Sequence, residues 1–274
     1  MNNMQPLLLE YQLAEGVRAF SSTRKGGVGE GAYSEFNITH YCGDSPDHVS
    51  QNRQLLCNEL GISDHQLFLP HQVHGKGILL INDDFLKCGE EERIKCLEGI
   101  DAVVTRIPGI CIGVSTADCV PVLLYDEEQK VSAAIHAGWR GTVAKIVSDT
   151  VRFMEDECGC AATNMKAIIG PSISLEAFEV GKEVYMEFSA AGFPMDSISR
   201  FYPHLAGDAE YHGQKGKWHL DLWAANWLLL EKAGIPFQNI QVANVCTYGT
   251  SDSFFSARRL GINSGRIFTG IIIH

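Results

Sequence analysis

The sequence predicts one α/β domain that covers residues 1–274. Short apolar segments typical of strands alternate with segments in which apolar residues recur at helical spacing. The length of 274 residues fits one large domain or two small ones. No linker, internal repeat or low-complexity segment divides the chain, which favours a single domain. The composition, with 45% hydrophobic and 20% charged residues, is that of an ordinary globular protein.

Strands are predicted where β-branched and other apolar residues form short runs between turn residues. These runs are residues 6–20, 77–81, 101–105, 110–114, 120–124, 131–135, 166–169, 177–180, 240–245 and 266–273. Two polar or charged stretches, 84–100 and 192–217, are predicted to be exposed loops.

Helices are predicted from their start and stop signals. Ser45 and Pro46 fit the N-cap and the first position of a helix that Gly61 ends. Residues 136–141 open another helix, and one more is predicted over 181–189. A last helix starts at Leu220 and has a predicted buried stripe of Leu220, Trp223, Ala224, Trp227 and Leu228.

The stretch from Cys111 to Gly141 holds the residues best suited to chemistry. A polar turn at 126–130 joins two predicted strands, which indicates a β-hairpin. The expected pairing places Cys119, at the start of the first strand, opposite His136, at the end of the second. A thiolate beside an imidazole is either a nucleophile with its base or a pair of metal ligands.

The segment His71–Gly75 offers a third donor. Its two histidines, His71 and His74, point to opposite sides of an extended chain, so one of them is expected to be a ligand and the other not. Three protein ligands with an open fourth position are typical of catalytic zinc sites that activate water. A metal-free pair, with Cys119 as nucleophile and His136 as base, is the rival interpretation, and a purely structural site is a third.

Several features could bind an anion. Arg140 falls on the first turn of the helix after His136, where free backbone N–H groups favour negative charge. A loop with four glycines between Gly26 and Gly31 could cradle an anion or could be a simple turn. Arg53, in the middle of the first predicted helix, is either a solvated side chain or a further anion contact.

Net charge and cysteine content restrict the partners and the compartment. The formal net charge of −11 lacks the basic surface expected for binding nucleic acid or an anionic membrane. The N-terminal segment lacks signal-peptide features, and no apolar run is long enough to cross a membrane. We therefore expect a cytoplasmic protein whose nine cysteines are reduced.

The chain resembles the YfiH family in nine motifs, which occur in the same order as in the family. They are STRKGGV (22–28), NR (52–53), HQVHG (71–75), ADCVPVLLYD (117–126), HAGWRGT (136–142), IGPSIS (169–174), FEVG (178–181), CTY (246–248) and FFSARR (254–259). The family comprises laccase-domain proteins, also called multicopper polyphenol oxidase-like, now regarded as purine nucleoside phosphorylases. The resemblance covers about residues 18–274.

The resemblance implies a single α/β domain with mixed β-sheets flanked by helices. It implies a zinc ion, with copper as another occupant, held by His74, Cys119 and His136. The implied reactions are phosphorolysis of adenosine, inosine and methylthioadenosine to base and ribose-1-phosphate, and deamination of adenosine. The implied partners are therefore a small nucleoside and phosphate, bound by a monomer or homodimer. Ala257 departs from the family, which commonly has an aromatic residue there.

This chemistry leads to further site expectations. A purine needs a flat pocket, for which Phe254 or Phe255 is a candidate wall and Gln72 a polar contact; core packing is the alternative for both phenylalanines. Phosphate would bind Arg53, Arg140 or the glycine loop. The family is also linked to phenol oxidation and peptidoglycan editing. A copper-dependent polyphenol oxidase needs several copper centres, which 10 histidines without a repeated H-x-H set do not suggest. A metal-free Cys–His hydrolase or amidase acting on a cell-wall precursor remains the alternative.

Overall fold

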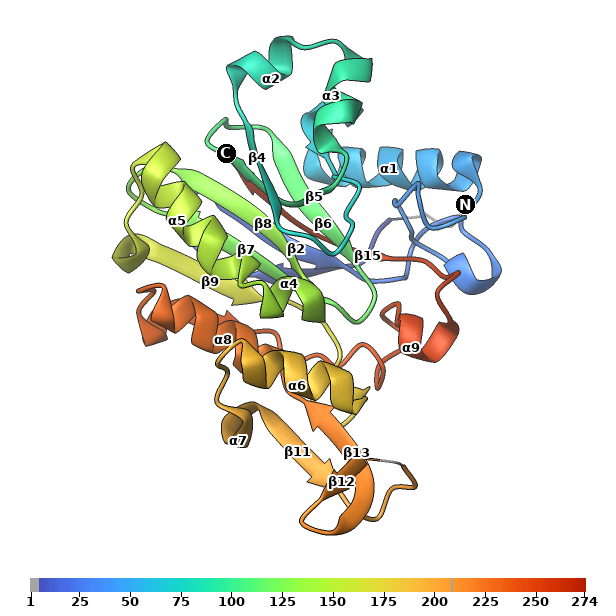
Figure 1. The fold of residues 1–274 in the computed structure, drawn as a ribbon. Coiled ribbons are helices and arrows are strands. Elements are labelled where there is room, and N and C mark those ends of the chain that lie inside the picture. Colours follow the sequence, from blue (N-terminus) through green and yellow to red (C-terminus); the bar gives the residue numbers. More distant parts are fainter. Residues whose placement is uncertain (1–4, 208) are drawn as a thin grey trace.

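The predicted hairpin lies at the centre of a six-stranded mixed sheet in the computed structural model, which describes residues 5–207 and 209–274 (Figure 1). Residues 1–4, part of the segment without signal-peptide features, lie outside the described residues. The strand order is β14 (Ile240–Val242), β9 (Met165–Ile169), β7 (Val120–Asp126), β8 (Val131–Ala137), β5 (Ile100–Thr105) and β4 (Gly77–Ile81). Every residue of β7 and β8 is buried, as expected for central strands covered on both faces.

A second sheet of five strands packs on one face of the first. Its order is β1 (Leu8–Tyr11), β2 (Val17–Ser22), β15 (Ile267–Ile273), β6 (Cys111–Thr116) and β3 (Leu67–Phe68). Leu123 and Ala134 of the central sheet share a buried cluster with Ile112 and Ile271 of the second sheet. The C-terminal strand β15 pairs with β2 from the N-terminal part of the chain, so distant segments close this layer.

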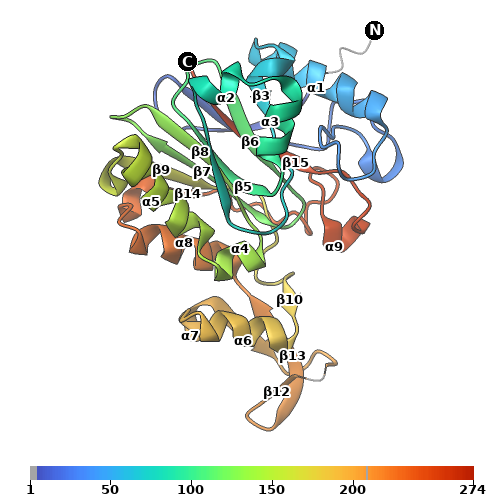
Figure 2. The ribbon, with the colours of Figure 1, turned by 45° about the horizontal axis from the view of Figure 1, so that its top comes forward.

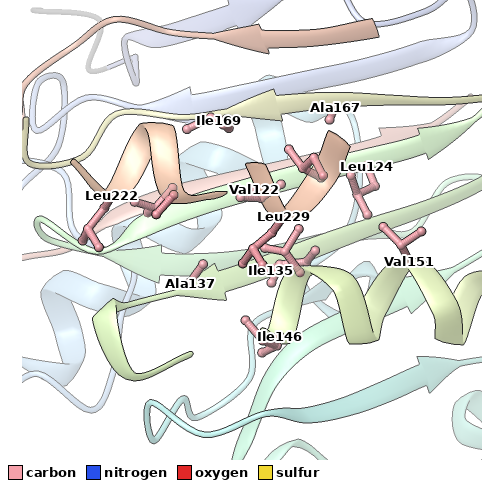
Figure 3. Packing of buried hydrophobic residues seen from close by; sticks show 14 of the residues in the cluster. Val122, Leu124, Ile135, Ala137, Ile146, Val151, Ala167, Ile169, Leu222 and Leu229 are labelled. Carbon is pink, nitrogen blue, oxygen red and sulfur yellow. The ribbon is translucent and has the colours of Figure 1, made fainter. Parts of the chain in front are cut away.

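Helices cover the outer faces of both sheets. α5 (Ile146–Cys158) and α8 (Leu222–Lys232) pack on the central sheet, and α1 (Pro46–Leu60) packs on the second. Figure 3 shows Ile146, Val151 and Leu229 directed at the strand residues Val122 and Ile135. Burying each such aliphatic side chain contributes about 1.5–3 kcal/mol. The structure is therefore the predicted α/β domain with mixed sheets flanked by helices.

A small antiparallel sheet with two helices projects from the rest of the molecule (Figure 2). It contains β10 (Glu179–Val180), β13 (Gln214–Leu220), β11 (Ser199–Tyr202) and β12 (Ala209–Tyr211), together with α6 (Lys182–Ala190) and α7 (Met195–Ile198). The prediction of an exposed loop over 192–217 was therefore wrong. These strands are short and partly exposed, so their polar and glycine residues hid the strand pattern.

Three other predictions need correction. Residues 84–100 form most of α2 (Asp83–Lys87) and all of α3 (Glu90–Leu97), which buries no residue and so lacks an apolar stripe. The helix after residue 138 is two helices, α4 (Trp139–Val143) and α5, because Lys145 has a left-handed conformation with φ 63°. In α8 the buried residues are Leu222, Ala225, Asn226, Leu229 and Leu230, not the predicted stripe.

The remaining elements are short. α9 spans Ala257–Leu260, and 3-10 helices span Gly31–Tyr33, Asp64–Gln66, Ala162–Asn164 and Phe237–Asn239. Among the described residues no helix combines the length and apolar character required to cross a bilayer.

Candidate metal centre

Three side chains from separate segments meet at one end of the central hairpin. His74 lies between β3 and β4, Cys119 immediately precedes β7, and His136 lies in β8. One donor atom from each lies within 4.8 Å of the others, and Cys119 Sγ is 3.8 Å from His74 Nε2. Zinc bonds of about 2.0–2.3 Å to nitrogen and sulfur place tetrahedral donors about 3.3–3.6 Å apart, close to the separation of Cys119 and His74. The three residues therefore fit a metal ion bound between them.

The hairpin forms as predicted, but its register differs by two residues. Pro121, not Cys119, pairs with His136, and Val120 pairs with Ala137. Cys119 instead lies beside Gly138, where an added Cβ would be 3.0 Å from Cys119 Sγ and 3.0 Å from His74 Cδ2. Gly138 has an ordinary backbone conformation, with φ −62°. Its missing side chain, rather than its flexibility, is what allows the three ligands to converge.

Asp101 supports this cluster and was not identified from the sequence. Its carboxylate is fully buried and lies 2.7 Å from His136 Nδ1. It also accepts hydrogen bonds from the backbone N–H groups of His74 (3.0 Å) and Gly75 (2.7 Å). His136 therefore directs Nε2 at the cluster, and His74 is held at the uncommon φ of 61°. The only sequence signal was an acidic residue at the start of an otherwise apolar strand.

Charges within the cluster shift the pKa values of Cys119 and His136 in opposite directions. Burial raises the pKa of the Cys119 thiol, but the charge of His136 and hydrogen bonds from both histidines outweigh it and lower the pKa to about 6. Burial lowers the pKa of His136, whereas the Cys119 thiolate and Asp101 raise it to about 9. Without a metal, the cluster is therefore a thiolate beside an imidazolium at neutral pH. A metal ion held by these residues would require the same thiolate and a deprotonated His136.

His71 lies apart from the cluster. Its Nδ1 is 2.9 Å from a carboxylate oxygen of Glu98, and its ring centroid is 4.4 Å from that of Tyr41. Of the two histidines in the HQVHG motif, His74 is therefore the one that joins the cluster.

Two residues expected to contact a purine are used inside the protein. The amide of Gln72 donates to the Ser115 carbonyl (2.8 Å) and accepts from the Ser115 N–H (2.7 Å), which ties the motif to β6. Phe255 is fully buried and packs in a cluster with Phe254. The guanidinium of Arg24 lies 4.8 Å from the ring centroid of Phe255. Contrary to expectation, Gln72 and Phe255 are internal packing and hydrogen-bonding groups.

The predicted anion contacts differ in their positions. Arg53 forms an ion pair with Asp64 (2.9 Å) and donates to the Leu67 carbonyl (3.3 Å). It lines a cavity of about 670 Å³ whose lining includes none of the three ligands. Arg140 is exposed on the first turn of α4, two residues after Gly138, with its guanidinium 4.3 Å from the Trp139 ring centroid. Of these two arginines, Arg140 is the one whose backbone lies within two residues of Gly138, which adjoins Cys119 and His74.

The glycine loop is filled by protein atoms. Asn52, buried in α1, accepts from the Val28 N–H (3.0 Å) and donates to the Glu35 carbonyl (3.1 Å). Cβ atoms added at Gly27 or Gly29 would collide with the Glu35 carbonyl. These glycines therefore permit close backbone packing against residue 35.

Known proteins are similar to this chain over most of its length. Residues 18–274 match a family model described as multi-copper polyphenol oxidoreductase laccase. A purine nucleoside phosphorylase of Bacteroides thetaiotaomicron is 48% identical over 94% of this chain and 92% of its own. Adenosine deaminase RL5, from an unknown prokaryotic organism, is 43% identical over 94% of each chain. Purine nucleoside phosphorylase YfiH of Escherichia coli is 36% identical over 91% of each.

A solved structure has the same fold along its whole length. The crystal structure of the hypothetical protein YfiH of Bacillus licheniformis superposes with a TM-score of 0.87 at 26% identity, covering 100% of this chain and 98% of the other. The family match, the sequence relatives and this superposition all extend over nearly the entire chain. The protein is therefore a member of the YfiH family, the multi-copper polyphenol oxidoreductase laccase family of its matching model.

Proposed function

We propose that the protein is a zinc-dependent purine nucleoside phosphorylase that also deaminates adenosine. The observation that carries this proposal is the cluster of His74, Cys119 and His136, oriented by Asp101, in a chain 48% identical to a relative named purine nucleoside phosphorylase. The deaminase activity is supported by the relative named adenosine deaminase RL5. Proposed substrates are adenosine, inosine and methylthioadenosine.

The donor set favours zinc. Two imidazoles and one thiolate are common zinc ligands, and three protein ligands leave a position open to substrate. When bound, zinc supplies a Lewis acid that polarises an oxygen atom. Among residues 5–207 and 209–274, this is the only group of three such donors close enough to share an ion. One cluster does not provide the several copper centres of a laccase, so copper bound here would be an alternative occupant of the same site.

In the proposed phosphorolysis, a phosphate oxygen forms a bond to C1′ of the nucleoside while the C1′–N9 bond breaks. The products are the purine base, which takes up a proton, and ribose-1-phosphate, or 5-methylthioribose-1-phosphate when the substrate is methylthioadenosine. Arg140 offers an exposed positive charge to the phosphate. In deamination, water replaces the 6-amino group of adenosine and ammonia is released. The buried Asp101 fixes the ring of His136 in both reactions.

A metal-free Cys–His hydrolase or amidase, acting on a cell-wall precursor, is the second candidate. It is favoured by the thiolate–imidazolium pair, because a thiol whose pKa is lowered to about 6 is a competent nucleophile at neutral pH. Against it, a second imidazole, that of His74, also contacts the sulfur. A nucleophile needs one base, whereas a metal uses both histidines.

Zinc analysis combined with turnover separates the two candidates. The wild type, Cys119→Ala and the control Cys96→Ala, which removes an exposed thiol of α3, would be assayed for zinc content and for conversion of adenosine with and without phosphate. We expect ribose-1-phosphate to form only with phosphate, and Cys119→Ala alone to lose both zinc and turnover. A metal-free wild type whose Cys119 is rapidly alkylated would support the hydrolase instead.

A further inference from the structure

The residue before the cysteine ligand connects the cluster to a second arginine. Asp118 has an uncommon φ of 87°, and one carboxylate oxygen accepts a hydrogen bond from Thr247 Oγ1 (2.7 Å). The other oxygen accepts from the backbone N–H of Arg258 (2.7 Å), at the start of α9. Asp118 directly precedes Cys119. The backbone of Arg258 is therefore hydrogen-bonded to the residue next to a member of the cluster.

The side chain of Arg258 is exposed and donates a single hydrogen bond to the described part of the protein. Its Nη2 donates to the Glu179 carbonyl (3.1 Å), and its guanidinium carbon lies 5.8 Å from the Phe178 ring centroid. A guanidinium has five N–H donors, so most of them stay available to a ligand. The carboxylate of Glu179 is paired with Lys217 Nζ (2.6 Å) and does not neutralise Arg258.

No carboxylate within the described parts of the chain forms an ion pair with Arg258. Acidic groups are abundant, because the chain has a net charge of −11. Arg53, by contrast, is paired with Asp64. An arginine without a carboxylate partner, whose backbone is hydrogen-bonded to the residue before Cys119, is suited to an anion that arrives from solution. The planar guanidinium matches the oxygens of phosphate.

We propose that Arg258 binds the phosphate co-substrate. The assignment rests on the proposed phosphorolysis and deepens it. The hydrogen bond that the Arg258 N–H donates to Asp118 holds the backbone of Arg258 in place. The guanidinium releases the Glu179 carbonyl and donates to two phosphate oxygens instead. Arg140 lies on α4, which begins after Gly138, and Arg258 lies on α9, whose backbone is hydrogen-bonded to Asp118, so the two arginines belong to different elements.

Substitution of Arg258 tests the proposal with a matched neighbour as control. Arg258→Met removes the charge and nearly keeps the length, Arg258→Lys keeps the charge, and Arg259→Met alters the adjacent exposed arginine, which lies over Tyr248. We expect Arg258→Met to raise the KM for phosphate about 10- to 100-fold, as for loss of a charge-assisted hydrogen bond. The KM for the nucleoside and the zinc content should stay at wild-type values, Arg258→Lys should restore part of the loss, and Arg259→Met should behave as wild type.

The outcomes separate this assignment from the proposed function. A phosphate KM in Arg258→Met equal to that of the wild type overturns the assignment but leaves phosphorolysis intact. If the wild type shows no phosphate-dependent turnover, the proposed function fails. Calorimetric titration of the zinc-loaded wild type and Arg258→Met with inorganic phosphate then tests whether Arg258 still forms an anion site. Binding lost in Arg258→Met would retain the anion site. Binding that is unchanged in the variant, or absent in the wild type, would overturn it.

Discussion

Replacing Asp101 with asparagine perturbs the support of the cluster without changing its size. One carboxylate oxygen lies near His136 Nδ1 (2.7 Å) and accepts from the His74 N–H (3.0 Å). The other accepts from the N–H groups of Gly75 (2.7 Å) and Val73 (3.3 Å). An asparagine that keeps its oxygen toward the histidines turns its NH₂ group toward two N–H donors, so both of those hydrogen bonds are lost.

The expected loss follows from these contacts. Each unsatisfied buried donor costs ~1–3 kcal/mol, and because both donors are only partly buried, we expect Asp101→Asn to lower the free energy of unfolding by about 2–3 kcal/mol. The weaker hold on His136 Nδ1 should also lower zinc affinity by about 10- to 100-fold, the usual effect of removing an outer partner of a metal-binding histidine.

Urea denaturation and competition with a zinc chelator measure the two effects. Asp149→Asn is the control, because Asp149 forms a surface ion pair with Lys76 (3.1 Å) worth about 0–1 kcal/mol. The reasoning is refuted if Asp101→Asn binds zinc as tightly as the wild type, or if it loses no more stability than the control.

Three further predictions test other parts of the site. Gly138→Ala should lower zinc affinity at least about tenfold, because the added Cβ would lie 3.0 Å from atoms of Cys119 and His74. The control Gly141→Ala, whose added Cβ has its nearest contact at 3.3 Å, should keep the wild-type affinity. Equal affinities of the two variants in the chelator competition would contradict this reasoning. In metal-free protein, alkylation of Cys119 by iodoacetamide should rise as pH increases through about 6, because the thiolate forms above its lowered pKa; a midpoint at the ordinary thiol value of 9.0 would disprove the pairing with His136. Arg53→Ala should leave the KM for phosphate unchanged, because Arg53 is held by Asp64 away from the cluster; a severalfold increase would return Arg53 to the site.

The hairpin and the approach of Cys119 to His136 could be predicted because their signals are local, whereas the choice of His74 over His71 came from the family resemblance. Val120–Leu124 and Val131–Ile135 are apolar runs joined by a polar turn, and Cys119 and His136 stand at the open end of both. A register error of two residues did not separate these two side chains, because Gly138 leaves space for the sulfur.

The support of the cluster could not be predicted because it depends on contacts between distant segments. Asp101 meets His136 across 35 positions of the chain, and Gln72 meets Ser115 across 43. Neither residue type indicates whether its polar atoms face a ligand or a backbone amide. Phe255 was assigned to a purine pocket for the same reason, because an aromatic ring can pack in the protein core as favourably as against a ligand, and Phe255 is fully buried.

Two helices were predicted wrongly for a related reason: α3 was missed, and α8 was identified as a helix but with the wrong buried face. α3 buries none of its residues, so it has no stripe to detect. In α8, apolar residues surround nearly the whole helix, and the buried face is set by neighbouring strands rather than by spacing.

Adenosine turnover by protein of known zinc content, measured with and without phosphate, tests the central claim most directly. The proposed function predicts ribose-1-phosphate in an amount equal to adenine plus hypoxanthine, formed only when phosphate is present and lost together with zinc in Cys119→Ala. Stoichiometric zinc in a protein that leaves every purine nucleoside unchanged would contradict it.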